Sequence, residues 1–167
     1  MVPELGFGLS TRAQMFWLAE GLPSSLVPGT RPRTTLTPTM VHRDGAPWLA
    51  FGTPGGDQQE QWSALLYLHH VHHAMDLQAA IDAPAFHTDH LVGSFWPRGF
   101  RPRAVTLESR FPEATRAELA RRGHAVEVAD AWSEGRLCAC AIEMRGGTRV
   151  LKAAANPRGM QGYAAAR

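Results

Sequence analysis

A pair of adjacent glycines, Gly55 and Gly56, constrains this chain more than any other feature of its sequence. The pair ends the stretch Gly-Thr-Pro-Gly-Gly (residues 52–56), which lies between an apolar segment at 47–51 and a long segment with helical spacing. Adjacent glycines let the backbone turn sharply and approach a ligand closely, and the first N–H groups of a helix have no partner within it. The stretch therefore predicts a strand-to-helix turn. Such a turn either holds a carboxylate, a phosphate or a developing oxyanion, or is a tight turn with no ligand.

The segments around the glycines predict a protein of mixed α and β structure. Residues 37–43 and 47–53 predict two strands joined by an Asp-Gly hairpin turn, and residues 57–75 and 76–83 predict two helices. The chain then leaves the second helix at 85–87, and residues 88–104 lack a regular pattern. Further strands are predicted at 104–108, 124–128, 137–144 and 149–154, with a helix at 112–122. This order predicts an α+β fold in which helices pack on a mainly antiparallel sheet.

Composition limits the class of protein. The 167 residues are 44% hydrophobic and 19% charged, which is typical of a single globular domain. Residues 1–33 are rich in Gly, Pro and Ser and predict an extended arm. A net charge of +2 does not suggest a nucleic-acid surface, and no apolar run approaches the length that spans a membrane. The first residues lack a signal-peptide pattern, so a cytoplasmic location is expected if the chain is complete, and no compartment is assigned otherwise.

The two cysteines, Cys138 and Cys140, are separated by one residue. In a strand this spacing places both side chains on one face, too close along the chain for an ordinary disulfide. We expect both to be small buried apolar residues, with a metal or redox role as the lesser alternative.

Four histidines cluster at positions 69, 70, 72 and 73 of the predicted first helix. His69 and His73 form an i,i+4 pair that could hold a metal ion, but the glutamate of a zinc-protease motif is absent between them. His87 and His90 are the nearest candidates for a third ligand. A metal-binding protein therefore remains an alternative to exposed or packing histidines, and it can be tested by zinc titration.

Two adjacent threonines, Thr34 and Thr35, precede the first predicted strand. Their hydroxyls and nearby N–H groups could bind a carboxylate, although threonines are also common in turns. The residues alone favour two turn threonines.

Five stretches of the sequence form a recognisable series. Residues 31–39 read Arg-Pro-Arg-Thr-Thr-Leu-Thr-Pro-Thr, and residues 74–87 read Ala-Met-Asp-Leu-Gln-Ala-Ala-Ile-Asp-Ala-Pro-Ala-Phe-His. Between them lies the Gly-Thr-Pro-Gly-Gly stretch, and Ala-Asn-Pro-Arg at 155–158 and Gly-Tyr at 162–163 follow. In this order they resemble the γ-glutamyltransferase family, whose patterns include Arg-Pro-x-Ser-Ser-Met-Ser-Pro-Thr, Gly-Ser-Pro-Gly-Gly and Ala-Asp-Pro-Arg. The resemblance covers essentially the whole chain.

This resemblance implies an N-terminal-nucleophile hydrolase with an αββα sandwich that cuts itself into two subunits and uses no cofactor. In that family the new N-terminal threonine of the small subunit attacks the γ-glutamyl carbonyl, with its own amino group as the base. Carried over by position, Gly55 and Gly56 would form the oxyanion hole. Thr34 and Thr35 would hold the α-carboxylate of a small-molecule acyl or γ-glutamyl substrate.

The same resemblance places the chain as a single domain in the C-terminal part of the small subunit. The nucleophile would then lie upstream of the segment matched by residues 6–16, and the first threonine here is Thr11. The large subunit and the N-terminal part of the small subunit would be its partners. We expect the chain alone to be inactive in acyl transfer or amide hydrolysis. The alternative is a non-catalytic remnant or binding module of the same fold.

One departure from the family pattern concerns the substrate amino group. By alignment, Arg12 and Met15 occupy the places of residues that grip this group in the family. A guanidinium and a thioether cannot balance an ammonium. The resemblance therefore implies an acyl group without the amine, such as a glutaryl group, and restoring Asp at position 15 should improve γ-glutamyl use.

Overall fold

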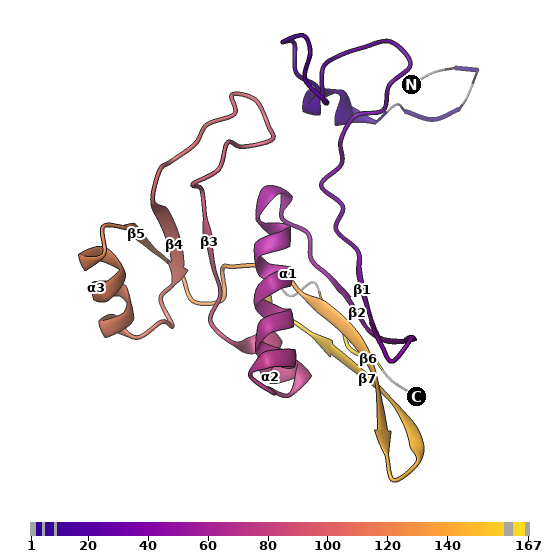
Figure 1. Ribbon diagram of the computed structural model, residues 1–167, viewed down its shortest axis with the longest axis vertical. Coiled ribbons are helices and arrows are strands. Elements are labelled where there is room, and N and C mark those ends of the chain that lie inside the picture. Colours follow the sequence, from indigo (N-terminus) through magenta and orange to yellow (C-terminus); the bar gives the residue numbers. More distant parts are fainter. Residues whose placement is uncertain (1–2, 5, 9, 159–161, 166–167) are drawn as a thin grey trace.

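The computed structural model describes residues 3–4, 6–8, 10–158 and 162–165 of the chain. They form two sheets with the helices at 59–67 and 77–82 between them (Figure 1). The larger sheet is antiparallel, with the strand order β1-β2-β6-β7. Its strands are β1 (Thr39–Arg43), β2 (Ala46–Gly52), β6 (Cys138–Arg145) and β7 (Thr148–Ala155). The smaller sheet has the order β3-β4-β5, with β3 (Phe86–Thr88) antiparallel and β5 (Ala125–Ala129) parallel to the central β4 (Ala104–Glu108). The predicted α+β class with mainly antiparallel pairing is confirmed.

The helices lie close to their predicted positions. They are α1 (Gln59–Tyr67), α2 (Leu77–Asp82) and α3 (Glu113–Arg121), with short 3-10 turns at η1 (Thr11–Met15) and η2 (Gly56–Gln58). The hairpin turn at Asp44 and Gly45 has positive φ at both residues, as a two-residue hairpin requires.

One predicted helix is too long, and one strand was not predicted. The helix expected over 57–75 continues as a π-helical turn, η3 (Leu68–His72), and stops there because Ala74 adopts a positive φ of 53°. The short strand β3 was also not predicted, since three residues give too little pattern and its pairing with β4 is a long-range contact.

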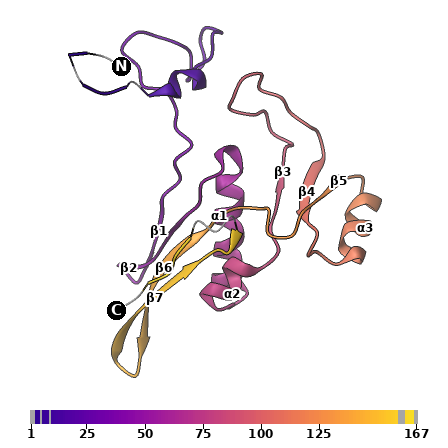
Figure 2. The same cartoon turned by 180° about the vertical axis from the view of Figure 1, so that it is seen from behind.

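The described residues of the N-terminal arm have little regular structure beyond η1 and a bridge between Trp17 and Ser25. It is attached to the loop at 89–103 through Arg98. The guanidinium of Arg98 donates to the Phe16 carbonyl at 2.5 Å and lies 4.1 Å from the ring centroid of Trp17. Figure 2 shows this loop and the arm at the same end of the molecule as the start of α1.

One face of the larger sheet forms the main core with α1 and α2. Side chains alternate along each strand, so Leu49 and Phe51 of β2 and Ala139 and Ala141 of β6 point towards the helices and are buried. Trp62, Leu66, Leu77 and Ile81 complete this core from the helices. None of the described helices is long and apolar enough to cross a membrane.

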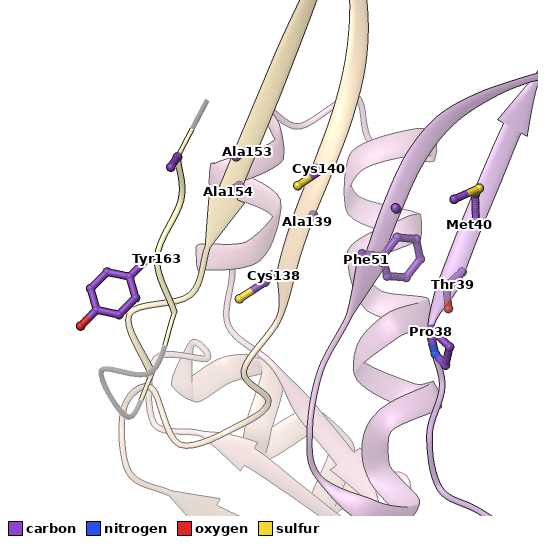
Figure 3. Close-up of a pocket in the computed structure, with 12 residues that line it drawn as sticks. Pro38, Thr39, Met40, Phe51, Cys138, Ala139, Cys140, Ala153, Ala154 and Tyr163 are labelled. Atoms are coloured by element: carbon purple, nitrogen blue, oxygen red, sulfur yellow. The ribbon is translucent and has the colours of Figure 1, made fainter. Parts of the chain in front are cut away.

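The other face of the larger sheet is open, and this corrects the expectation for the cysteines. Cys138 and Cys140 lie on the same face, as their spacing predicts, but both are exposed and unbridged. Figure 3 shows them with Met40 on the side of the sheet away from the helices. They line an apolar hollow of about 590 Å³ that continues over Ala50 and Ala153. We call these five residues the open face. Alternation fixed which side they take, but burial depends on a covering layer that the described residues do not include.

Candidate functional site

The glycine pair forms a turn at the carboxyl end of β2. Gly55 has φ 142° and Gly56 has φ 66°, which are conformations that other residues rarely adopt. Gly56 opens the 3-10 turn η2, so its N–H is one of the first donors of the helical segment that follows. The turn lines an open cavity of about 780 Å³. The predicted strand-to-helix turn is therefore present, and it faces a space that could receive a substrate.

The predicted carboxylate-binding residues differ in their placement. Thr35 lines the cavity together with the glycines, whereas the Thr34 hydroxyl accepts a hydrogen bond from the Leu36 N–H at 3.1 Å, and Thr34 is not among the lining residues. Arg12 also lines the cavity, and its Nη1 donates to Thr35 Oγ1 at 3.1 Å. Met15 is only 2% exposed and is not among the lining residues. The structure thus brings together Gly55, Gly56, Thr35 and Arg12.

Three further residues of the cavity were not identified from the sequence. Thr37 donates through its hydroxyl to Gln59 Oε1 at 3.0 Å. This bond joins the segment before β1 to the first turn of α1. Phe95 belongs to the loop at 89–103, and its Cε2 would lie 3.5 Å from a Cβ added at Gly56. The irregular sequence of this loop gave no signal that an aromatic ring would reach the glycine turn.

The indole ring of Trp62 in α1 packs against the glycine turn at Gly55. A Cβ added at Gly55 would lie 2.1 Å from Cζ3 of Trp62, and one added at Gly135 would lie 3.1 Å from its Cγ and Cδ2. The indole Nε1–H donates to Glu134 Oε2 at 3.2 Å, and the same oxygen lies 2.5 Å from His87 Nδ1. Trp62 and Glu134 are 8% and 6% exposed. The sequence pattern placed Trp62 on the apolar face of the helix, but it did not show this polar partner.

The neighbouring carboxylates and the burial of His87 together shift the pKa of its ring. The hydrogen bond with Glu134 raises the pKa of His87 above its usual 6.5, against the opposing effect of burial, and the carboxylates of Asp89 and Glu127 add to the increase. His87 Nε2 lies 3.7 Å from Asp89 Oδ1. A raised folded-state pKa means that the protonated ring stabilises the fold below the unfolded pKa, and that this contribution is lost as the pH rises through the folded value.

A buried ion cluster joins the C-terminal Ala-Asn-Pro-Arg motif to the rest of the molecule. Glu108 is fully buried and accepts from Arg158 Nε at 2.8 Å and from Arg110 Nη2 at 2.6 Å. Arg158, only 2% exposed, also donates to the carbonyls of Ile81 at 2.7 Å and Ala83 at 2.9 Å. These bonds satisfy the last carbonyl groups of α2, so the motif fixes this helix against β4.

The histidine stripe supplies no complete metal site. Among the described residues, no group of three or more His, Cys, Asp or Glu side chains is arranged to hold a metal ion. His69 and His73 have ring centroids 6.2 Å apart, and His70 Nδ1 lies 2.8 Å from the Met75 carbonyl. Two rings on one turn remain below the three or four protein ligands of an ordinary zinc site.

Known proteins are similar to this chain over nearly its whole length. The oxamate amidohydrolase proenzyme of Klebsiella pneumoniae is 32% identical over 158 residues, covering 95% of this chain and 29% of that protein. The solved structure of LmbA2991HD is 59% identical with a TM-score of 0.89, covering 99% of this chain and 29% of that chain. The cephalosporin acylase of Bacillus halodurans is 28% identical with a TM-score of 0.75, covering 92% of this chain and 26% of that chain.

The chain thus spans less than a third of the length of these three relatives. The family model described as gamma-glutamyltranspeptidase matches residues 1–166, and the neighbouring structures share its N-terminal-nucleophile hydrolase fold. The resemblance of the five motifs is confirmed by this match. The chain belongs to the gamma-glutamyltranspeptidase family.

Proposed function

We propose that this chain forms part of an acyl-transfer or amide-hydrolysis site, with Gly55 and Gly56 as the oxyanion hole. The observation that carries the proposal is the shared cavity, in which the glycine turn faces Thr35 and Arg12. A carbonyl oxygen that gains negative charge during attack is stabilised by N–H groups held in advance at the right position. The positive φ of Gly56 and the support of Gly55 by Trp62 provide that rigidity. Relatives named as an amidohydrolase and an acylase support this class of reaction.

The nucleophile and its base belong, in this proposal, to the part of the protein that the relatives have and this chain does not span. An N-terminal threonine supplied there would attack the carbonyl carbon, and its own amino group would take the hydroxyl proton. The chain described above would hold the substrate and the developing charge. No metal ion or organic cofactor takes part in such a mechanism.

The acyl group is the second element of the proposal. Arg12 carries a permanent positive charge beside the Thr35 hydroxyl, so the two side chains together suit a carboxylate of the substrate. No carboxylate of the described residues lines this cavity to receive a substrate ammonium group. A carboxylate-bearing acyl group without an α-amine, such as a glutaryl group, fits these residues better than a γ-glutamyl group.

The substitution Met15→Asp is a poor test of this substrate preference, because residue 15 is buried and the new carboxylate would be buried with it.

Arg12→Gln tests the substrate assignment in the complete protein. Loss of a charged hydrogen bond of about 1.5–3 kcal/mol should lower kcat/KM for a glutaryl anilide about tenfold to a hundredfold. The γ-glutamyl anilide has the same carboxylate, but its ammonium group is no longer repelled by a cation at position 12, so its kcat/KM should fall less. The ratio of glutaryl to γ-glutamyl kcat/KM should therefore decrease. Arg31→Gln is the matched control, since Arg31 is an exposed arginine of the arm that does not line the cavity. Unchanged kcat/KM values for both anilides in Arg12→Gln would remove Arg12 from the substrate site.

We further propose that the remaining part of the complete protein covers the open face. This sheet surface carries Met40, Ala50 and Ala153 beside the two thiols, and an apolar surface of that kind is normally buried. Relatives of more than three times this length supply the chain needed to cover it.

Thiol labelling tests this cover. Cys138 and Cys140 should react with a maleimide in the isolated 167-residue chain, where both are exposed, and should be protected in the complete protein. Peptide mapping identifies the two sites, and labelling of the complete protein in urea shows that both thiols are present and reactive. Equal labelling of the folded complete protein and the isolated chain would show that this face stays open.

A further inference from the structure

We propose that His87 and Glu134 act as positioning residues for the glycine turn, and that Trp62 transmits their effect. This inference rests on the proposed oxyanion role of Gly55 and Gly56. None of the three side chains lines the cavity, so none of them is placed to touch the substrate. Their contacts instead form a continuous path from the smaller sheet to the turn.

The first step of the path is the fit between Trp62 and the turn. The indole ring is held between Gly55 and Gly135, where an added Cβ would lie 2.1 Å and 3.1 Å from ring atoms respectively. Such close backbone approach leaves no room for the ring to tilt without moving Gly55. The position of the Gly55 peptide therefore depends on the orientation of the indole.

The second step is the polar anchor of the indole. The ring has one hydrogen-bond donor, and Nε1–H gives it to Glu134 Oε2 at 3.2 Å. Glu134 is itself fixed, because its backbone N–H donates to the buried Glu108 Oε1 at 3.1 Å. A carboxylate held in this way defines one orientation of the ring in an otherwise apolar contact.

The third step is the oxygen of Glu134 that Trp62 and His87 share. His87 Nδ1 lies 2.5 Å from the same Glu134 Oε2, and the Trp62 and His87 rings meet edge to face with centroids 6.1 Å apart. The groups facing His87 are acidic, namely Glu134, Asp89 and Glu127, while Arg101 pairs with Asp89 and Glu127. These carboxylates favour the protonated form of His87, because they raise the pKa of the ring against the opposing effect of burial. A charged His87 attracts Glu134 more strongly than a neutral ring does, so deprotonation of His87 weakens the pull on the oxygen that Trp62 also uses.

The Trp62 indole resonance tests the coupling without any catalytic readout. In the complete protein labelled with ¹⁵N-tryptophan, the Nε1–H signal missing from Trp62→Phe is assigned to Trp62. We expect this signal to shift with pH, with a midpoint above the usual histidine value, and to lose that shift in His87→Gln. His124→Gln is the control, since His124 is exposed and lies at the start of β5, away from the path. A signal that does not move with pH in the wild type, or that still titrates in His87→Gln, overturns the proposal.

The kinetic test separates positioning from substrate binding. His87→Gln and Trp62→Phe should each lower kcat about tenfold with KM unchanged. We expect the wild-type kcat–pH profile to have a limb above the usual histidine pKa, and His87→Gln should flatten it. A changed KM with unchanged kcat in both variants would contradict a role at the oxyanion turn. If Gly55→Ala retains full activity, the oxyanion role fails, whereas the pH-dependent indole signal still reports whether the His87–Glu134–Trp62 contact exists.

Discussion

Gly55→Ala should lower kcat of the complete protein about a hundredfold to a thousandfold, which is the usual effect of losing an oxyanion-hole donor. Two features of Gly55 combine in this result. An added Cβ would lie 2.1 Å from Trp62 Cζ3, and the φ of 142° is strained for any residue with a side chain. The peptide must therefore rotate or shift, and its N–H no longer points to the position where the oxyanion forms. KM should change much less than kcat, because the oxyanion exists only in the transition state and the intermediate.

The control for Gly55→Ala is Gly99→Ala. Gly99 has no positive φ and open space where a Cβ would be added, so this substitution should leave both stability and turnover unchanged. Urea unfolding of the same samples separates misfolding from a displaced turn. A folded Gly55→Ala protein with activity within twofold of wild type would rule out the oxyanion role of this glycine.

Glu108→Gln should destabilise the fold by about 3–5 kcal/mol, the usual effect of removing one partner from a buried ion pair. Glu108 is fully buried, and its carboxylate is the shared acceptor for the guanidinium groups of Arg158 and Arg110. The neutral amide would leave Arg158, only 2% exposed, without its counter-charge. The midpoint of urea unfolding at neutral pH measures the loss. Glu113→Gln is the matched control, because Glu113 pairs with Arg116 on an exposed helix surface and should cause no measurable change.

The same carboxylate should make the fold sensitive to acid. Burial acts to raise the pKa of Glu108, but the hydrogen bonds from Arg158 and Arg110 outweigh it, so the pKa lies below the usual 4.5. A lowered folded-state pKa means that the stabilisation is complete above the unfolded value and is lost as the pH falls through the folded value. Wild type should therefore lose stability below about pH 4.5 more steeply than Glu108→Gln does. Parallel acid profiles for the two proteins would show that this ion pair does not contribute.

Local sequence patterns predicted the parts of the molecule whose structure depends on residues close together in the sequence. The Asp44–Gly45 hairpin, the glycine turn and the three α-helices follow from turn residues and apolar spacing, and the motif resemblance brought Gly55, Gly56 and Thr35 to one place. Contacts between distant segments were not predicted. The strand β3, the approach of Phe95 to the turn and the cluster around Glu108 each join residues that a single sequence does not pair.

The cysteines show a different limit of the sequence. Alternation along β6 placed Cys138 and Cys140 on one face, and this part of the prediction is confirmed. Their burial was inferred from residue type, but burial depends on whatever layer lies over the sheet. A surface that a longer protein would cover has the same sequence pattern as a core.

The order in which the chain is synthesised gives the ion cluster a further consequence. Arg158 follows Glu108 by 50 residues, yet together with Arg110 it supplies the bonds that hold the end of α2 to β4. During translation the segments carrying α2 and β4 leave the ribosome well before their arginine partner does. Until residue 158 emerges, Glu108 has Arg110 as a partner but not Arg158, so burial of its carboxylate is compensated less fully. The last turn of α2 should therefore dock late, and a chaperone or a neighbouring segment that shields this region would speed the maturation of the protein.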